Sequence, residues 1–271
     1  MARVVLGLRR PRVRFRILGM EVAGVVESVG AEVTKFRPGD RVFGFTGFGA
    51  GGYAQYVCMR ESSSLALIPS GLGVDEACTL VDGPTTALYF LRDRARIGAG
   101  DRVLIVGASG SIGTAAVQIA RHFGAHVTGV CSGKNAALVR SLGADQIVDY
   151  TEQAFETRDD TYDIIFDTVG KSTFRRARRC LTIGGRYLVT IGGPLSFLHD
   201  AWSRWFGSRK FVFGMSVDKR AALETVTELV SNGALRAVID RRYPLEDIAA
   251  AHRYVESGRK RGNVVITVSA P

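Results

Sequence analysis

The sequence predicts an α/β protein in which a doubly wound parallel sheet accompanies a smaller, barrel-like β unit. Short strand-like runs punctuated by glycine and proline occupy residues 24–57, and such punctuation is typical of small barrels. From about residue 100 onward, strand-like and helix-like runs alternate along the chain. Alternation of this kind predicts parallel strands whose connecting helices cover both faces of the sheet.

The β unit is predicted from its turns. Valines follow Gly24, and a Pro-Gly-Asp turn at 38–40 leads into a strand at 41–43. A glycine cluster at 47–52 then precedes a second strand at 53–57. Short strands separated in this way favour a small barrel-like unit.

The central region supplies the alternating elements. Predicted strands cover residues 102–106, 126–130, 146–149, 162–167 and 186–191, and predicted helices cover 111–123 and 134–142. Apolar residues recur on one face of the first helix, from Ile112 to Phe123, as expected of a helix packed on a sheet. The C-terminal region adds helices at 219–232 and 245–257 and strands at 237–243 and 263–268.

Composition narrows the classes of partner. The chain is 46% hydrophobic and 23% charged, as in globular proteins, and it has no run of eighteen apolar residues that would predict a membrane span. The net charge of +10 is dispersed, and its densest clusters, at 9–16 and 175–179, are not interleaved with aromatic residues. We therefore predict solvated basic faces that attract anionic ligands, and no nucleic-acid partner.

The cysteines and the N-terminal residues indicate the cellular compartment in which the protein is expected. The four cysteines are far apart and form no CxxC pair, so we predict neither a disulfide framework nor a cysteine-built zinc site. The arginine-rich start has no apolar signal core. These features favour a reduced, cytoplasmic setting, with import into an organelle as the open alternative.

The strongest local signal is the glycine-rich run from Gly107 to Gly113. It leaves the predicted strand at 102–106 and opens the predicted helix, which is the setting of a dinucleotide-binding turn in a Rossmann sheet. Gly107 would make the tight turn, Gly110 would let the backbone approach a pyrophosphate, and Gly113 would let the helix pack closely. The helix N-terminus would then direct its amides at the phosphates.

The end of the next strand predicts which dinucleotide binds. A site specific for NAD places an Asp or Glu there to hold the ribose hydroxyls. This chain has Ser132, Lys134 and Asn135 in that segment and no carboxylate. A lysine pairs with a 2′-phosphate as a point charge, so the sequence favours NADPH over NADH.

These residues resemble the medium-chain dehydrogenase/reductase superfamily, specifically its zinc-independent, quinone oxidoreductase-like branch. The matching runs are ILGMEVAGVVESVG, FRPGDRVFG, GGYAQYV, GDRVLIVGASGSIGTAAVQIARHFGA, SLGADQIVDY, YDIIFDTVG, GGRYLVTIGG and RGNVVITV. The resemblance implies a Rossmann domain at 85–216 and a GroES-like barrel substrate domain built from residues 1–84 and a return segment at 217–271. Family members have further strands before the ILG run, where this chain has MARVVLGLRRPRVRFR, so the barrel is expected to be incomplete.

The resemblance also implies cofactor contacts at matching positions. The pyrophosphate positions, besides Gly107 and Gly113, are Ser109, Gly110, Ser111 and Ile112, and the adenosine positions are Ser132, Lys134 and Tyr150. The nicotinamide positions are Thr86, Val169, Ile191 and Gly192, with Gly262 and Asn263 on the returning tail strand. For Thr86 and Tyr150, ordinary packing is the alternative role.

Zinc-dependent relatives carry a Gly-His-Glu run and cysteine ligands, and this chain departs from both patterns. The corresponding run is Gly19-Met20-Glu21, and Asp82 stands at a second ligand position. A thioether is a poor ligand for zinc, and the four-cysteine loop is replaced by residues 47–52. We therefore predict no metal.

The resemblance implies hydride transfer from NADPH to a small electrophile, a quinone or an α,β-unsaturated carbonyl. No catalytic residue can be assigned from the sequence, although Tyr53 and Asp82 are weak candidates for the proton donor. A non-catalytic NADPH-binding or scaffold protein and a zinc alcohol dehydrogenase are the alternatives. A homodimer is expected through the edge strand containing KFVFGM at 210–215.

Overall fold

The computed structural model describes residues 17–159 and 161–268. The arginine cluster at 9–16 lies outside them. The chain forms two compact units. Unit 1 contains residues up to Asp82, together with 217–232 and the segment from Ala237 onward, and unit 2 contains Gly83–Ser216 and Gly233–Arg236.

Unit 2 is built on a six-stranded parallel sheet with the order β6-β5-β4-β7-β8-β9. Its strands are β4 (Arg102–Val106), β5 (His126–Cys131), β6 (Gln146–Asp149), β7 (Tyr162–Asp167), β8 (Leu181–Val189) and β9 (Lys210–Phe213). Its helices are α3 (Asp82–Leu88, with Asp82 itself in unit 1), a π-helical turn (Tyr89–Arg94), α4 (Ser111–His122), α5 (Ala136–Ser141), α6 (Phe174–Ala177) and α7 (Pro194–Phe206).

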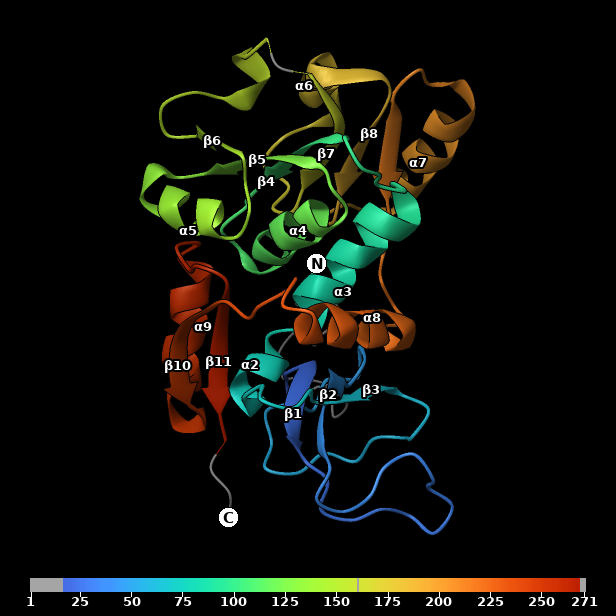
Figure 1. The fold of residues 1–271 in the computed structure, drawn as a ribbon, viewed down its shortest axis with the longest axis vertical. Coiled ribbons are helices and arrows are strands. Elements are labelled where there is room, and N and C mark those ends of the chain that lie inside the picture. The colour runs from blue at the N-terminus through green and yellow to red at the C-terminus, as the bar shows by residue number, and fades with distance from the viewer. Residues whose placement is uncertain (1–16, 160, 269–271) are drawn as a thin grey trace, which may run out of the picture. The chain divides into compact units, whose positions relative to one another are not determined.

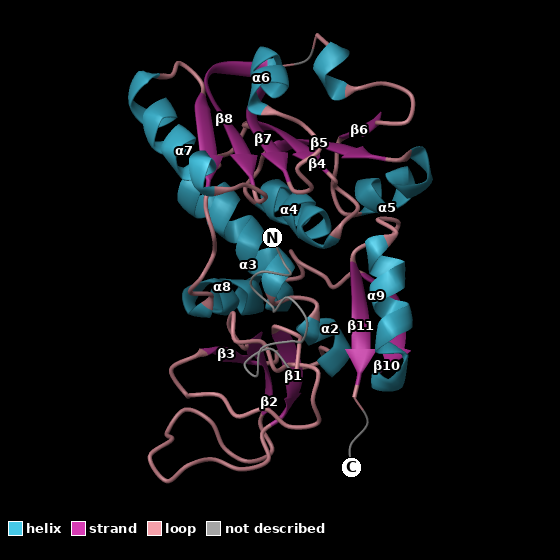
Figure 2. Cartoon of the chain, turned by 180° about the vertical axis from the view of Figure 1, so that it is seen from behind, coloured by secondary structure: helices cyan, strands magenta, loops and turns pink. Residues whose placement is uncertain are grey.

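The connections are those of a doubly wound fold. From β4 the chain adds β5 and β6 on one side and then β7, β8 and β9 on the other. Figures 1 and 2 show α4 and α5 on one face of the sheet and α6 on the opposite face. Ligands bind such sheets at the carboxyl ends of the strands, where the strand order reverses. Here that point lies between β4 and β7.

Hydrophobic burial holds the sheet together. The side chains of Leu104, Ile105, Ile164, Ile165 and Phe166 are fully buried at 0% exposure, because central parallel strands are covered on both faces. On α4 the apolar face predicted from the sequence is buried as well, with Ile119 and Ala120 at 0%. These contacts confirm the predicted α/β class.

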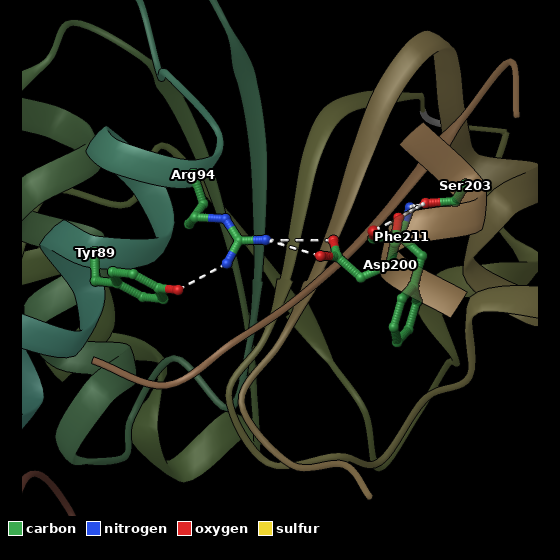
Figure 3. Close-up of polar contacts among 5 residues, drawn as sticks. All are labelled: Tyr89, Arg94, Asp200, Ser203 and Phe211. Atoms are coloured by element: carbon green, nitrogen blue, oxygen red, sulfur yellow. Dashed lines mark hydrogen bonds and ion pairs between the residues drawn. The ribbon is translucent and has the colours of Figure 1, made fainter. Parts of the chain in front are cut away.

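The edge strand β9 is fixed by α7, as Figure 3 shows. The Ser203 hydroxyl accepts a hydrogen bond from the Phe211 amide at 2.9 Å and donates one to the Phe211 carbonyl at 3.0 Å. One turn earlier, Asp200 pairs with Arg94 at 3.0 Å, and Arg94 donates to the Tyr89 hydroxyl at 2.7 Å. An exposed edge strand normally offers its backbone to other chains. Here the backbone amide and carbonyl of Phe211 already have the Ser203 hydroxyl as their partner.

Unit 1 contains an antiparallel sheet of β1 (Glu21–Val25), β2 (Arg41–Phe45) and β3 (Ser64–Leu67) in that order. It also contains α2 (Val74–Cys78), α8 (Arg220–Ser231) and α9 (Ile248–Glu256), and the parallel pair β10 (Ile239–Pro244) and β11 (Asn263–Thr267). Phe43 and Phe45 of β2 are buried at 1% and 5% exposure.

Two predicted strands are wrong in position. The run at 53–57 is a loop, because Tyr56 and Val57 are 57% and 41% exposed and give it no buried face. The third strand is instead Ser64–Leu67, which the sequence analysis missed. Strand β8 begins at Leu181, five residues before the predicted start. Gly184, with φ +80°, lies within the strand at a shift in its register with β7, and the strand continues past it.

No described helix has the length and apolar character needed to cross a membrane.

Candidate functional site

The glycine-rich turn lies directly after β4, where the sheet order reverses. Gly107 has φ +78°, a left-handed conformation that glycine adopts without strain. Gly110 is the extended residue that precedes α4. A Cβ on Gly113 would overlap the Gly107 carbonyl oxygen and come within 2.8 Å of the Ala108 Cα. A side chain at Gly107 or Gly113 would therefore strain or obstruct this turn, whereas the approach of a pyrophosphate at Gly110 stays a prediction.

Helix α4 presents its N-terminal amides at this turn. The first intrahelical bond runs from the Thr114 amide to the Gly110 carbonyl at 2.8 Å. The amides of Ile112 and Gly113 precede it in the first turn, where N–H groups have no carbonyl partner within the helix. Together with the helix dipole, they form a favourable position for a phosphate.

A second loop, after β7, packs against the glycine turn. The Cγ1 atom of Val169 would lie 2.7 Å from a Cβ on Gly107, so Val169 lies directly beside the turn. The loop is held by the fully buried Asp167, whose carboxylate accepts from the amides of Gly170 at 2.8 Å and Ser172 at 2.9 Å. It also accepts from the Tyr187 hydroxyl at 2.9 Å.

Two further predicted positions follow β8. Ile191 is 62% exposed, and its Cβ would lie 3.3 Å from a Cβ on Gly170. A side chain on Gly192 would collide with Ser196 and Phe213. Val169, Ile191 and Gly192 thus gather at the carboxyl edge of the sheet with the glycine turn. Thr86 lies on α3 and is only 9% exposed. One turn earlier, Gly83 lies close to the start of α4, because a Cβ added to it would be 3.0 Å from the Ser111 carbonyl oxygen.

The predicted adenosine end follows β5. Ser132 is 8% exposed, and the Asn135 side chain donates to the Ser109 hydroxyl at 3.1 Å. The Asn135 Oδ1 atom is buried with no hydrogen-bond partner among the described residues. Lys134 is exposed, and Tyr150 is 62% exposed. These residues fit the outer half of a dinucleotide.

One carboxylate at this end escaped the sequence analysis. Asp149 ends β6, and Cys131 of β5 is its register partner, so its carboxylate lies beside Gly133. The Thr151 hydroxyl and amide donate to it at 2.7 and 2.9 Å, and with the Gly133 amide they lower its pKa. The segment after β5 contains no carboxylate, as the sequence indicates, but the fold brings the carboxylate of Asp149 next to it. The carboxyl ends of neighbouring parallel strands share an edge, but only the strand order of the folded sheet makes β6 the neighbour of β5.

Unit 1 contains the two candidate proton donors, Tyr53 and Asp82, together with Glu21 and Lys219, and we call these four residues the acidic cluster. The Lys219 ammonium, only 1% exposed, lies 2.9 Å from Asp82 Oδ1. Glu21 Oε1 accepts from the Asp82 amide at 2.8 Å. Burial, followed by the charge of Asp82, raises the pKa of Glu21 to about 7. The Tyr53 ring packs on Gly19, and burial followed by the charge of Glu21 raises the pKa of Tyr53. Glu21 and Asp82 were already expected near each other as residues at former zinc-ligand positions, but Lys219 was not predicted, because it lies 137 positions beyond Asp82 in the sequence.

The last two predicted contacts also lie in unit 1. Gly262 has φ +65°, and a Cβ there would overlap the Val238 carbonyl. Asn263 donates to the same carbonyl from its amide at 2.9 Å and from its side chain at 3.2 Å. Both residues therefore have a structural role in joining β11 to the segment before β10.

Comparison with known proteins assigns the chain to a family. Residues 3–70 match the model of the alcohol dehydrogenase GroES-like domain, and residues 142–266 match that of the zinc-binding dehydrogenases. The mouse protein "NAD(P)H oxidoreductase RTN4IP1, mitochondrial" (Mus musculus) is 32% identical over 282 aligned positions, covering 93% of this chain and 70% of that protein. The chain belongs to the medium-chain dehydrogenase/reductase family.

Further relatives agree with this assignment. A quinone oxidoreductase of Pseudomonas aeruginosa is 30% identical, with 92% of this chain and 81% of that protein covered. The solved structure of the quinone oxidoreductase from Coxiella burnetii superposes with a TM-score of 0.79 at 25% identity, covering 93% of this chain and 79% of that one. As a medium-chain dehydrogenase/reductase, the chain is an oxidoreductase that uses a nicotinamide cofactor. The predicted family and the predicted Rossmann and GroES-like fold are confirmed.

Proposed function

We propose that this medium-chain dehydrogenase/reductase transfers a hydride from NADPH to a quinone or an α,β-unsaturated carbonyl without zinc. The observation that carries the proposal is the juxtaposition, at one edge of the sheet, of the glycine turn, the Val169 loop and the Ser132–Lys134 segment. The proposal also includes the remaining predicted cofactor contacts, which are Thr86, Tyr150, Ile191, Gly192, Gly262 and Asn263.

The preference for NADPH rests on charge. Lys134 supplies an exposed ammonium next to Ser132, which suits a 2′-phosphate. The carboxylate of Asp149 lies beside this segment, and hydrogen bonds from Thr151 and Gly133 already engage it. A carboxylate that selects NADH must instead accept from the ribose hydroxyls.

The acidic cluster supports zinc independence. Met20 replaces the imidazole ligand, and the Asp82 carboxylate is paired with the ammonium of Lys219. A zinc ion bound to Asp82 would have to displace that buried ammonium or lie beside its positive charge. These residues do not fit a tetrahedral zinc site, which needs three or four deprotonated ligands.

A zinc-free site suits electron-poor acceptors. Without a Lewis acid, a simple carbonyl is poorly polarised, whereas a quinone or a conjugated enone accepts hydride at an electron-poor carbon. The protein would orient the two reactants and exclude water. A proton for the resulting oxyanion would come from solvent, Tyr53, Asp82 or the protonated form of Glu21.

Loss of NADPH absorbance with a panel of quinones and enones tests the proposal. We expect turnover with NADPH and much less with NADH, in protein treated with a chelator. Tight NADPH binding without turnover of any acceptor would instead support the scaffold alternative. Activity on alcohols that disappears with the chelator and returns with zinc would support the alcohol dehydrogenase.

We also propose a homodimer through the β9 edge of unit 2. Because Ser203 already satisfies the backbone of Phe211, the contact would use apolar side chains of α7 beside that edge. Leu195 and Leu198 are 78% and 67% exposed, and a second copy of the same patch would cover them.

Light scattering tests the dimer. The double variant Leu195→Glu/Leu198→Glu is expected to be monomeric with an unchanged melting temperature, because neither side chain is buried in the monomer. Ile183→Glu, at an apolar position that is even more exposed at 85%, is the control. A dimer that survives the double variant contradicts this interface.

A further inference from the structure

The sheet of unit 2 has a second edge, at the amino ends of its strands. Arg178 and Arg179 immediately precede Cys180 and the start of β8, and Arg209 immediately precedes β9. Since all six strands are parallel, these arginines lie at the edge opposite the glycine turn. Whatever they bind is therefore distinct from the proposed dinucleotide.

The arginines surround a pocket of about 470 Å³. Its described lining consists of Arg175, Arg178, Arg179 and Arg209, which we call the arginine pocket. Two segments about thirty residues apart in the chain contribute to it. Its volume is within the range of small-molecule sites, about 300–1,000 Å³.

Neighbouring acids do not neutralise this pocket. The side chains of Arg175, Arg178 and Arg179 make no hydrogen bond or ion pair with any residue that the structure describes. Glu156 is held instead by the Ser172 hydroxyl at 2.8 Å and by Arg176 at 3.6 Å. Asp163 is held by the Thr182 hydroxyl at 2.9 Å and by the amide of Arg102 at 2.9 Å.

One of the four guanidinium groups is oriented by the backbone. Arg209 Nε donates to the Leu181 carbonyl at 2.7 Å. This hydrogen bond holds the Nε end of the guanidinium group at the first residue of β8. The same residue lines the pocket. An arginine held in this way loses less conformational entropy when it binds an anion.

Four like charges around one pocket repel one another, and an anion relieves that repulsion. Guanidinium forks bind phosphate oxygens in a bidentate manner, so four of them match more than one phosphate group. No aromatic side chain is among the described lining residues, although stacking platforms are the usual feature of single-stranded nucleic-acid sites. We propose that the arginine pocket binds a small molecule carrying two or more phosphate groups.

Calorimetric titration of the 271-residue chain with inorganic tripolyphosphate tests this proposal, with and without saturating NADPH. We expect one site per chain with a Kd on the order of 10 μM at moderate salt, and the same Kd when NADPH is present. Inorganic monophosphate should bind at least about tenfold more weakly, because it engages fewer guanidinium forks.

Two variants assign the signal to the pocket. Arg178→Ala/Arg179→Ala should weaken tripolyphosphate binding by at least about tenfold, whereas Arg253→Ala/Arg259→Ala removes the same charge from exposed positions in unit 1 and should change it little. Arg178→Lys/Arg179→Lys keeps the charge and is expected to bind with intermediate affinity. This variant keeps the test decisive if the alanine variant does not fold.

Several results would overturn the proposal. Displacement of tripolyphosphate by NADPH would place it at the glycine turn, and equal losses in the two alanine variants would indicate adventitious attraction to net charge only. A single-stranded oligonucleotide that binds more tightly than tripolyphosphate through the same arginines would make this a nucleic-acid surface. Vesicles of phosphatidylcholine with and without a phosphoinositide bisphosphate distinguish a lipid headgroup from a soluble phosphate source, and either source satisfies the proposal.

Discussion

The two edges of the sheet in unit 2 offer anions different kinds of partner. At the carboxyl edge, backbone amides of α4 and the loop held by Asp167 surround the glycine turn, and Lys134 is the one lysine in the proposed contact set. At the amino edge, four arginine side chains line a pocket. Amides fix a ligand by shape and dipole, whereas guanidinium groups attract it by net charge. The first edge should therefore be sensitive to small steric changes and the second to salt.

The largest effect is expected from Gly113→Ala at the carboxyl edge. The new Cβ would overlap the Gly107 carbonyl oxygen, and relieving that clash must displace the turn from the helix. Overpacking of this kind costs about 3 kcal/mol, which corresponds to about a 100-fold loss of NADPH affinity if it falls on the bound geometry. Fluorescence titration with NADPH measures it.

Gly98→Ala is the matched control, because nothing lies within 4 Å of a Cβ at Gly98. It should leave NADPH binding unchanged. Normal affinity in a folded Gly113→Ala protein would show that the turn does not hold the pyrophosphate. Tripolyphosphate binding at the arginine pocket should persist in both variants if the edges act independently.

Two aspartates on the same strand sharpen the comparison further. Asp167 ends β7 at the carboxyl edge and organises the Val169 loop, whereas Asp163 near the start of β7 bonds to the Arg102 amide and the Thr182 hydroxyl. Asp167→Asn places an amide NH₂ among hydrogen-bond donors and should lower the free energy of unfolding by about 3 kcal/mol. NADPH affinity should fall about thirtyfold as the loop moves.

Asp163→Asn makes the same substitution at the opposite edge. We expect it to lower the melting temperature modestly and to leave NADPH affinity within about twofold of the wild-type value. Thermal melting and NADPH titration of both variants separate loss of stability from loss of binding. Equal losses of affinity would mean that Asp167 acts only through global stability.

The difference between the edges also explains what could be predicted from the sequence. Gly107, Gly110 and Gly113 could be assigned because backbone conformation restricts their residue type, and the spacing that results is visible along the chain. Asp149 and Asp167 could not, because their importance depends on which strands become neighbours. The cluster at 175–179 was visible as charge, but its meeting with Arg209 requires the order of β8 and β9. In unit 1, the buried Lys219 and Glu21 depend on tertiary contacts in the same way.

A smaller effect is expected from Lys134→Gln, which removes the single lysine charge of the proposed contact set. It should weaken NADPH binding about tenfold, since a hydrogen bond to a charged group contributes about 1.5 kcal/mol. NADH lacks the 2′-phosphate and serves as the control ligand, with unchanged affinity. Equal weakening of both cofactors would place Lys134 away from the phosphate and remove the charge argument for NADPH.

The smallest effect is the response of NADPH binding to salt. Raising ionic strength from about 0.1 M to about 1 M shortens the Debye length from about 10 Å to about 3 Å. Tripolyphosphate should lose about tenfold or more in affinity over that range, because four exposed or partly exposed guanidinium groups supply its attraction. NADPH should lose only about threefold, since amides at short range are screened little and Lys134 is its one lysine partner. Parallel titrations of the two ligands across this range measure both slopes. Equal slopes would mean that net charge governs both edges, and that the amides of α4 do not distinguish the carboxyl edge.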